Sequence, residues 1–324
     1  MAHNIMDNNK FFGYRTPAWH SLGTVCDDSK SVLEVASMLD IPNTFMGDVF
    51  DSFGNPIKNS QAIHTRHSDG RVFTHGIVSK NRYHLVGHLD VLGIAHDVVS
   101  DAPVETMGLL GEGGELFCTF KLPEFRVKDD ALKPFLMLYN PLDGLSAIRA
   151  RNVVVRVVCQ NTVMIALGEK TEHFLSLKHT KNAKDKIREW LAGVWLGQSE
   201  AVSFMESYYT RLYDTDMHAS AIDGVLSLVY PDPSAIDESK ASTDEMLAYI
   251  SKKDRATTDR ATVCSLMHNS PSLPNDAKGT AYGLLQSVVE YEDFLRPYHR
   301  ASSSVFGAGA DRKNDCNKAL AAYL

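Results

Sequence analysis

The order of apolar and polar residues divides the chain into a strand-rich first half and a helix-rich second half. Between about residues 61 and 162, short segments rich in β-branched and aromatic residues predict strands: IHTRH, RVFTHGIVS, VETMGLL, ELFCTFKL, PFLMLYN and VVVRVVC. Turn-forming sequences at residues 111–114 and 140–144 separate neighbouring segments in the manner of hairpins. The pattern therefore predicts mostly antiparallel strands, with one helix at about residues 87–99.

Beyond residue 177 the apolar residues recur every three or four positions, which is the period of an amphipathic helix. This spacing predicts a long helix over about residues 182–213, which Gly193 and Gly197 could split in two. After a turn-rich stretch, Ser242 and Glu245 have capping-box spacing ahead of another helix. A last helix over about residues 280–295 should end before Pro297.

These elements predict an α+β fold, in which an antiparallel β-sheet core is covered by helices and the C-terminal half is mainly helical. We expect residues 1–175 to form a β-rich α+β core and residues 176–324 to form a mainly helical region packed on it. The longest apolar runs are strand-sized, well short of the roughly 20 residues that span a bilayer. The N-terminus lacks the pattern of a signal peptide, and we expect no membrane partner.

The cysteines and the charge narrow the function further. Five cysteines lie singly, without a C-x-x-C motif, which is typical of reduced thiols in a cytoplasmic protein and not of a disulfide or zinc framework. The net charge of -7 does not favour binding to a polyanion. Any nucleic-acid site must therefore be a local concentration of cations.

The densest basic stretch covers residues 149–188 and supplies the candidate nucleic-acid contacts. Cations near the start of the predicted long helix oppose its macrodipole, and a bound anion such as phosphate would explain their position. The alternative is an ordinary solvated helix face. The candidates are Arg149, Arg151, Arg156, Lys178, His179, Lys181, Lys184, Lys186 and Arg188.

A groove for a single strand also needs a face and stacking platforms. We expect the three arginines to project from one face of the sheet, and Val153, Val155 and Val157 to project from the other. Bases of single-stranded DNA stack on aromatic side chains. We include Trp19 in the site as an aromatic candidate. Further aromatic candidates, which could either stack on bases or pack in the core, are Phe11, Phe12, Tyr14 and Tyr139.

Catalytic and metal-binding signatures are weaker. Cys159 follows a predicted strand, where a thiolate could act as a nucleophile with His20 or His179 as its base, but no third orienting residue can be named. The pairs His64 with His67 and His84 with His88 lack neighbouring cysteines, and H-E-x-x-H is absent. We therefore predict no enzyme activity, no metal, no cofactor and no small-molecule substrate.

Four sequence blocks stand out along the chain: RTPAWHSLGT at residues 15–24, VVCQNT at 157–162, KHTKNA at 178–183, and GTAYG at 279–283 leading to Glu290-Tyr291. Together they resemble a phage and plasmid protein family catalogued as a domain of unknown function. The last block differs from the family's usual form, where Trp is expected in place of Tyr282 and Asn in place of Gln286.

The resemblance implies a mobile-element origin, which would place the protein in the host cytoplasm. The β-rich core followed by helices is also similar to phage single-strand annealing proteins of the RecT and Red-beta type. We therefore expect non-catalytic binding to single-stranded DNA, or RNA, with strand annealing in recombination by a homo-oligomer. The alternatives are a Cys/His-dependent enzyme acting on nucleic acid or a host target, and a protein-interaction factor that modulates host machinery.

Overall fold

The computed structural model describes residues 10–15, 23–99, 102–156, 162–164, 174–237, 240–297 and 307–324. The chain divides into two compact units. Unit 1 comprises residues 1–123, 133–153 and 169–202, and unit 2 comprises residues 124–132, 154–168 and 203–324. The predicted division had a single break after residue 175. In the structure, the segment after that position still belongs to unit 1 up to residue 202.

The main sheet of unit 1 has the strand order β10-β9-β7-β6-β1-β2, and β12 pairs with β10. Strands β6, β7 and β9 are antiparallel neighbours, as predicted, whereas β1 and β2 are parallel. Phe12, Met107, Phe120 and Leu136 are fully buried in its core. The strands are β1 (Phe11–Tyr14), β2 (Thr24–Cys26), β6 (Val104–Leu110), β7 (Glu115–Lys121), β9 (Asp130–Pro141), β10 (Ile148–Arg156) and β12 (Phe174–Leu177).

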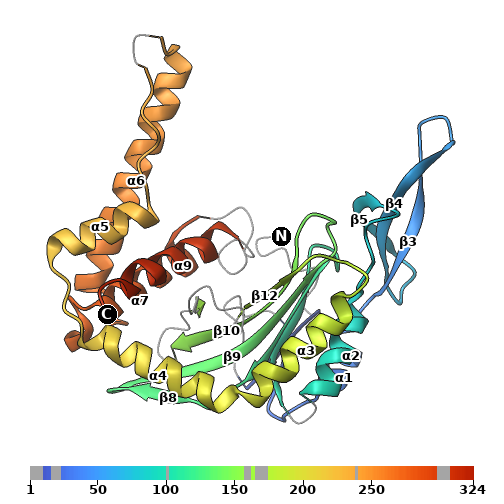
Figure 1. Cartoon of the computed structure of the whole chain (residues 1–324), viewed down its shortest axis with the longest axis horizontal. Coiled ribbons are helices and arrows are strands. Elements are labelled where there is room, and N and C mark those ends of the chain that lie inside the picture. Colours follow the sequence, from blue (N-terminus) through green and yellow to red (C-terminus); the bar gives the residue numbers. More distant parts are fainter. Residues whose placement is uncertain are drawn as a thin grey trace. The chain divides into compact units, whose positions relative to one another are not determined.

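A second, antiparallel sheet of unit 1 has the order β3-β4-β5. Its strands are β3 (Asn43–Phe50), β4 (Pro56–Arg66) and β5 (Val72–Ser79), and it projects away from the main sheet (Figure 1). Ile63 and Val78 anchor its base by packing on Leu142. At its tip, the Asp51 carboxylate accepts hydrogen bonds from the N–H groups of Phe53 and Asn55, both at 2.9 Å.

Helices α1 (Val32–Met38), α2 (His88–Val98) and α3 (Ala183–Leu196) gather beside the main sheet of unit 1 (Figure 1). Gly87 is the N-cap of α2, so the helix predicted over residues 87–99 is confirmed. The predicted long helix is divided into α3 and α4 (Gln198–Asp214) at Gly197. Glycine lowers helix stability, so the break falls at one of the two positions that the sequence indicated.

Unit 2 is mainly helical, in agreement with the prediction for the C-terminal half. Its helices after α4 are α5 (Ala219–Val229), α6 (Thr243–Asn269), η2 (Asn275–Ala277), α7 (Ala281–Glu290), the π-helix η3 (Tyr291–Leu295) and α9 (Ala308–Ala321), and two short strands are β8 (Phe125–Val127) and β11 (Thr162–Met164). Almost every residue of α7 is buried, which places it at the centre of the unit. The Tyr282 hydroxyl donates to Asp130 at 2.6 Å in that core.

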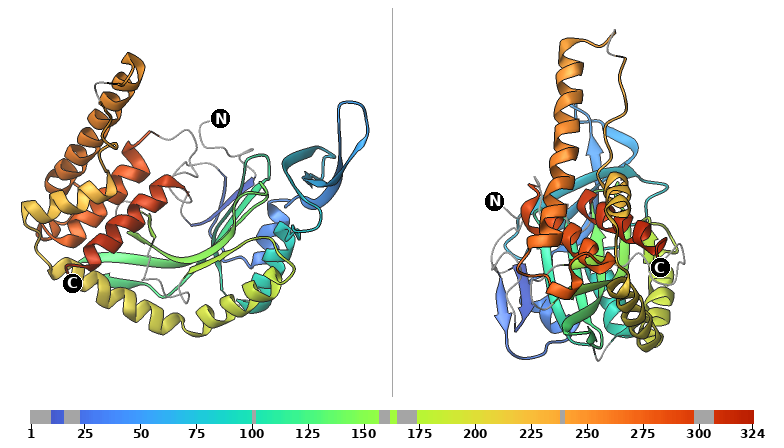
Figure 2. Two further views of the ribbon diagram at one scale, coloured as in Figure 1. Left: turned by 45° about the horizontal axis from the view of Figure 1, so that its top comes forward. Right: turned by 90° about the vertical axis from the view of Figure 1, so that its left-hand side faces the viewer.

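The predicted capping box at Ser242 and Glu245 is confirmed at the start of α6. The first half of α6 extends beyond the other helices of its unit (Figure 2) and is largely exposed. Within the described ranges, no helix is both long enough and apolar enough to cross a membrane.

Candidate nucleic-acid interface

Pairing of β10 with β12 brings two separate parts of the predicted basic stretch together. Ile148 lies opposite Leu177, and Arg149 lies opposite Ser176, so Arg149 is close to the chain that enters α3 through Lys178. Arg149 is half-buried and Lys178 is exposed. The antiparallel register therefore joins residues that are far apart in the sequence into one edge of unit 1.

Arg151 and His179 are buried, so they do not present the contacts predicted for them. Arg151 is 5% exposed and His179 is 2% exposed. His179 Nδ1 accepts a hydrogen bond from the Val86 N–H at 3.2 Å, so Nε2 carries the proton and donates to the Pro141 carbonyl at 3.0 Å. Its ring stacks on Tyr83 at a centroid distance of 4.8 Å. His179 is a core residue that holds the start of α3 in place.

The expected separation of arginines from valines in β10 is wrong. Alternate residues of a strand share a face, and β10 is one strand from Ile148 to Arg156. Arg149 and Arg151 therefore lie on the same face as Val153, and Arg156 follows the opposite parity. The side chain of Arg156 lies outside the described part.

Two of the three cations in α3 form ion pairs with acidic residues of α2. Lys184 Nζ lies 2.7 Å from Asp90 Oδ1, and Arg188 Nη2 lies 3.2 Å from Asp97 Oδ2. These carboxylates supply the negative charge that the cations need near the helix N-terminus. Part of the basic stretch is thus explained by packing of α3 against α2, without a bound phosphate.

Lys178, Lys181 and Lys186 remain exposed at the start of α3. Among the described residues, none of the three has an acidic partner within ion-pair distance. We call these three residues the lysine group. Together with Arg149 it is what remains of the predicted site.

The proposed stacking platforms do not gather beside the lysine group. Phe11, Phe12 and Tyr139 are buried in the main sheet, and the Tyr139 hydroxyl donates to Glu115 at 2.8 Å. Tyr14 is half-buried at the end of β1. Trp19 lies outside the described residues. Within the described ranges the site therefore offers cations rather than aromatic surfaces.

The catalytic alternative has little support in the described part. Cys159 and His20 lie outside it, and burial lowers the pKa of His179 to about 4, with both ring nitrogens already hydrogen-bonded. His64, His67 and His88 each bond a hydroxyl, a carbonyl or an amide, while His84 is exposed. Among the described residues, no group of three His, Cys, Asp or Glu side chains is arranged to hold a metal ion.

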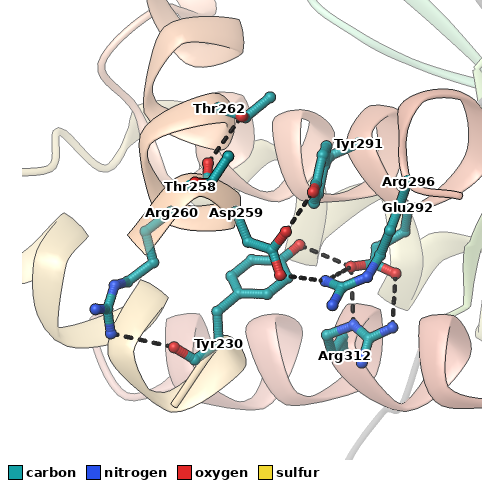
Figure 3. Close-up of polar contacts among 9 residues, drawn as sticks. All are labelled: Tyr230, Thr258, Asp259, Arg260, Thr262, Tyr291, Glu292, Arg296 and Arg312. Carbon is teal, nitrogen blue, oxygen red and sulfur yellow. Dashed lines mark hydrogen bonds and ion pairs between the residues drawn. The ribbon is translucent and has the colours of Figure 1, made fainter. Parts of the chain in front are cut away.

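Unit 2 contains a buried charged network that the sequence reasoning missed. Glu292, which is 0% exposed, accepts from Arg312 Nε at 2.8 Å and Nη2 at 3.2 Å, from Arg296 at 3.3 Å and from the Tyr230 hydroxyl at 2.9 Å. Arg296 also lies 2.9 Å from Asp259, to which the Tyr291 hydroxyl donates. Figure 3 shows these side chains converging from α6, η3, α9 and the end of α5. We call them the carboxylate–arginine network.

The network has the bonding of a structural cross-link. Glu292 Oε1 accepts three hydrogen bonds and Oε2 accepts one, and two arginines balance the carboxylates of Glu292 and Asp259. Lys313, also buried, pairs with Asp293 at 2.6 Å. The i, i+4 spacing of Glu292 and Arg296 was a visible sequence signal. Its remaining partners come from distant segments and were not predictable from spacing.

The fold and the site together define an α+β protein with exposed lysines at one edge of unit 1. The family model described as a domain of unknown function (DUF932) matches residues 74–320, so the chain belongs to that family. No curated protein and no solved structure matches the chain. The mobile-element origin and the likeness to annealing proteins stay predictions.

Proposed function

We propose that this protein binds single-stranded DNA, or RNA, through the lysine group without acting on it chemically. The observation that supports the proposal is the exposure of Lys178, Lys181 and Lys186, while the neighbouring Lys184 and Arg188 are paired with α2. Arg149 lies next to this edge through the β10–β12 register and would extend the phosphate contacts.

Such a site would be weak in a single copy. Three or four phosphate contacts to a single strand give a salt dependence of about -0.7 per contact on a double-logarithmic plot. The protein's net charge of -7 opposes binding further. We therefore propose that a homo-oligomer aligns several copies along one strand, because linked weak sites gain avidity. Strand annealing would follow from holding the bases of an extended strand accessible.

Fluorescence anisotropy with a labelled oligonucleotide tests the site. We expect Lys181→Glu/Lys186→Glu to weaken binding at least tenfold at low salt and to flatten the salt dependence. The matched control is Lys252→Glu/Lys253→Glu, which makes the same change in net charge on the exposed part of α6. Equal losses in both variants would mean that only overall charge matters and would reject the lysine group as the site.

Sedimentation velocity with and without oligonucleotide tests the assembly. An oligomer that grows when the strand is added is the expected result. A monomer under both conditions would contradict annealing, even if the lysine group still binds.

A role as a protein-interaction factor is the second candidate, and the tip of the β3–β4 hairpin favours it. Phe53 is 87% exposed and Phe50 is 58% exposed, on a turn held by Asp51. Large exposed aromatics on a preorganised turn are typical of anchors in protein interfaces. Absence of any salt-dependent oligonucleotide binding by the unmodified protein would make this the leading function.

A further inference from the structure

Four histidines lie where the β3-β4-β5 sheet meets the rest of unit 1. We call His67, His75, His88 and His179 the histidine cluster. Glycines allow the close approach there: a Cβ on Gly114 would lie 2.5 Å from His75 Nδ1, and one on Gly113 would lie 3.1 Å from the His67 ring. His67 Nε2 is also 3.2 Å from the Glu112 carbonyl. The imidazoles of His67 and His75, at the base of the β3-β4-β5 sheet, thus contact the β6–β7 turn.

The hydrogen bonds of His88 and His179 require neutral imidazoles. The two N–H groups of Asn140 Nδ2 donate to the Val86 carbonyl at 3.2 Å and to His88 Nδ1 at 3.1 Å. His88 Nε2 therefore carries the proton and donates to the Gly113 carbonyl at 2.9 Å. His179 has the same tautomer, because its Nδ1 accepts from the Val86 N–H. A proton added to Nδ1 of His88 or His179 would point at the N–H group that now donates to that nitrogen.

The electrostatic surroundings differ from one histidine to the next. Asp143 lies near His179 and favours its protonated form, and Asp40 and Asp69 lie near His67. His75 faces His64 and His67, and its Nε2 lies 2.8 Å from the Thr65 hydroxyl. His88 faces His75 and His179. Protonating one of these rings therefore makes it harder to protonate the next while the cluster stays closed.

The cations and acids bordering the cluster are already paired with one another. Lys10 bonds Asp40 at 3.1 Å, and Arg71 bonds Asp69 at 2.6 Å. The α2 carboxylate Asp90 bonds Lys184 and the Gly87 N–H. Burial is therefore the main influence on the imidazoles, and the desolvation that it causes lowers the pKa values of His75, His88 and His179 to about 4.

We propose that the histidine cluster is an acid-operated release, in which uptake of protons detaches the base of the β3-β4-β5 sheet from the β6–β7 turn and β9 while the main sheet stays folded. Opening exposes the imidazoles to water, where they regain ordinary basicity. A protonated Nδ1 then donates to water and no longer faces another N–H donor. The hairpin that carries Phe50 and Phe53 then changes its orientation within unit 1.

The sign of the pH dependence follows from the depressed basicity. Above pH 6.5 both open and closed forms are neutral at these sites, and the closed form has its full stability. As the pH falls toward 4, the open form binds protons that the closed form does not. The opening equilibrium increases about tenfold per pH unit for each proton taken up.

Pulsed hydrogen–deuterium exchange of the full chain, after incubation between pH 7 and 4, tests the proposal. We expect peptides covering β5 and residues 111–114 to lose protection about a hundredfold per pH unit, as two protons require, before peptides of β7 and β9 do. Simultaneous loss throughout unit 1 would overturn the proposal, because the sheet would then have no separate opening.

Variants and imidazole NMR separate titration from packing. We expect His88→Gln/His179→Gln to shift the opening of β5 to lower pH, whereas the exposed control His268→Gln leaves it unchanged. If the double variant does not fold, ring ¹⁵N shifts of the unmodified protein decide. His88 and His179 should be neutral Nε2–H tautomers at pH 6, and a closed form that titrates near pH 6.5 would overturn the proposal.

Discussion

The histidine cluster of unit 1 and the carboxylate–arginine network of unit 2 are both buried and polar, but their stability depends on different things. Unit 1 buries neutral imidazole rings, and hydrogen bonds fix His88 and His179 each in a single tautomer. Unit 2 buries charges of both signs that satisfy one another. A neutral cluster is sensitive to an added proton, whereas a charged network is sensitive to the loss of one partner.

The stability of the two units should therefore respond differently to a fall in pH. The lowered pKa values of His75, His88 and His179 place the loss in unit 1 between pH 6.5 and 4. The two described histidines of unit 2, His218 and His268, are exposed. Buried tyrosines with raised pKa values occur in both units, Tyr139 in unit 1 and Tyr209 in unit 2, so alkaline conditions should destabilise both.

The largest effect is expected from removing the centre of the network. Glu292→Ala removes the buried carboxylate that pairs with both Arg312 and Arg296 and leaves one carboxylate, Asp259, in the network, so we expect a loss of about 3–5 kcal/mol in the free energy of unfolding. Urea denaturation followed by circular dichroism measures it.

The matched control breaks an exposed ion pair in the same unit. Lys240 is 82% exposed and pairs with Asp237 at 2.9 Å. Lys240→Gln should change the free energy of unfolding by less than about 1 kcal/mol. Similar losses in Glu292→Ala and Lys240→Gln would show that the network contributes no more than a surface pair.

A smaller effect is expected from the two phenols of the network. Tyr291→Phe and Tyr230→Phe each remove a hydrogen bond to a carboxylate, worth about 1.5–3 kcal/mol near neutral pH. Burial, with bonding to Asp259, raises the pKa of Tyr291 to about 12, so its contribution is present below pH 10 and is lost as the pH rises toward 12. Stability measured from pH 8 to 11.5 should fall less steeply in Tyr291→Phe, while the exposed control Tyr323→Phe keeps the original slope.

Local signals in the sequence predicted much of the fold. The strands that became β4 to β7, β9 and β10, the helix α2 and the capping box of α6 follow from residue type and period, which act over a few neighbours. The sequence interpretation did not include α1, β3 or α9. Helix α9 docks with buried Lys313 and Asn317 on the face that its pattern would assign to solvent. Only partners elsewhere in the chain make those polar residues interior.

The candidate site was predicted less well, since its residues depend on tertiary contacts. Charge counting could not show that Arg188 pairs with Asp97, which is 91 positions away, or that Arg151 is buried. The error about the faces of β10 is of another kind, because the numbering alone puts Arg149 and Arg151 on the same parity as Val153. Residue type indicated which part of the sequence is rich in cations, and packing decided which of those cations stay exposed.

The smallest effect is expected from the ion pair between α2 and α3. Lys184 and Asp90 are both partly exposed, with side-chain exposures of 49% and 40%, so their coupling should be about 0.2–1 kcal/mol and should fade in high salt. Asp90 also accepts from the Gly87 N–H at the start of α2, which makes Asp90→Ala alone more costly than Lys184→Ala. A double-mutant cycle separates the capping term from the ion pair. Lys186→Ala is the control, because Lys186 has no acidic partner among the described residues and should leave stability unchanged. A coupling energy of zero at low salt would mean that Asp90 acts only as a cap, and that Lys184 is as available to an anion as the lysine group is.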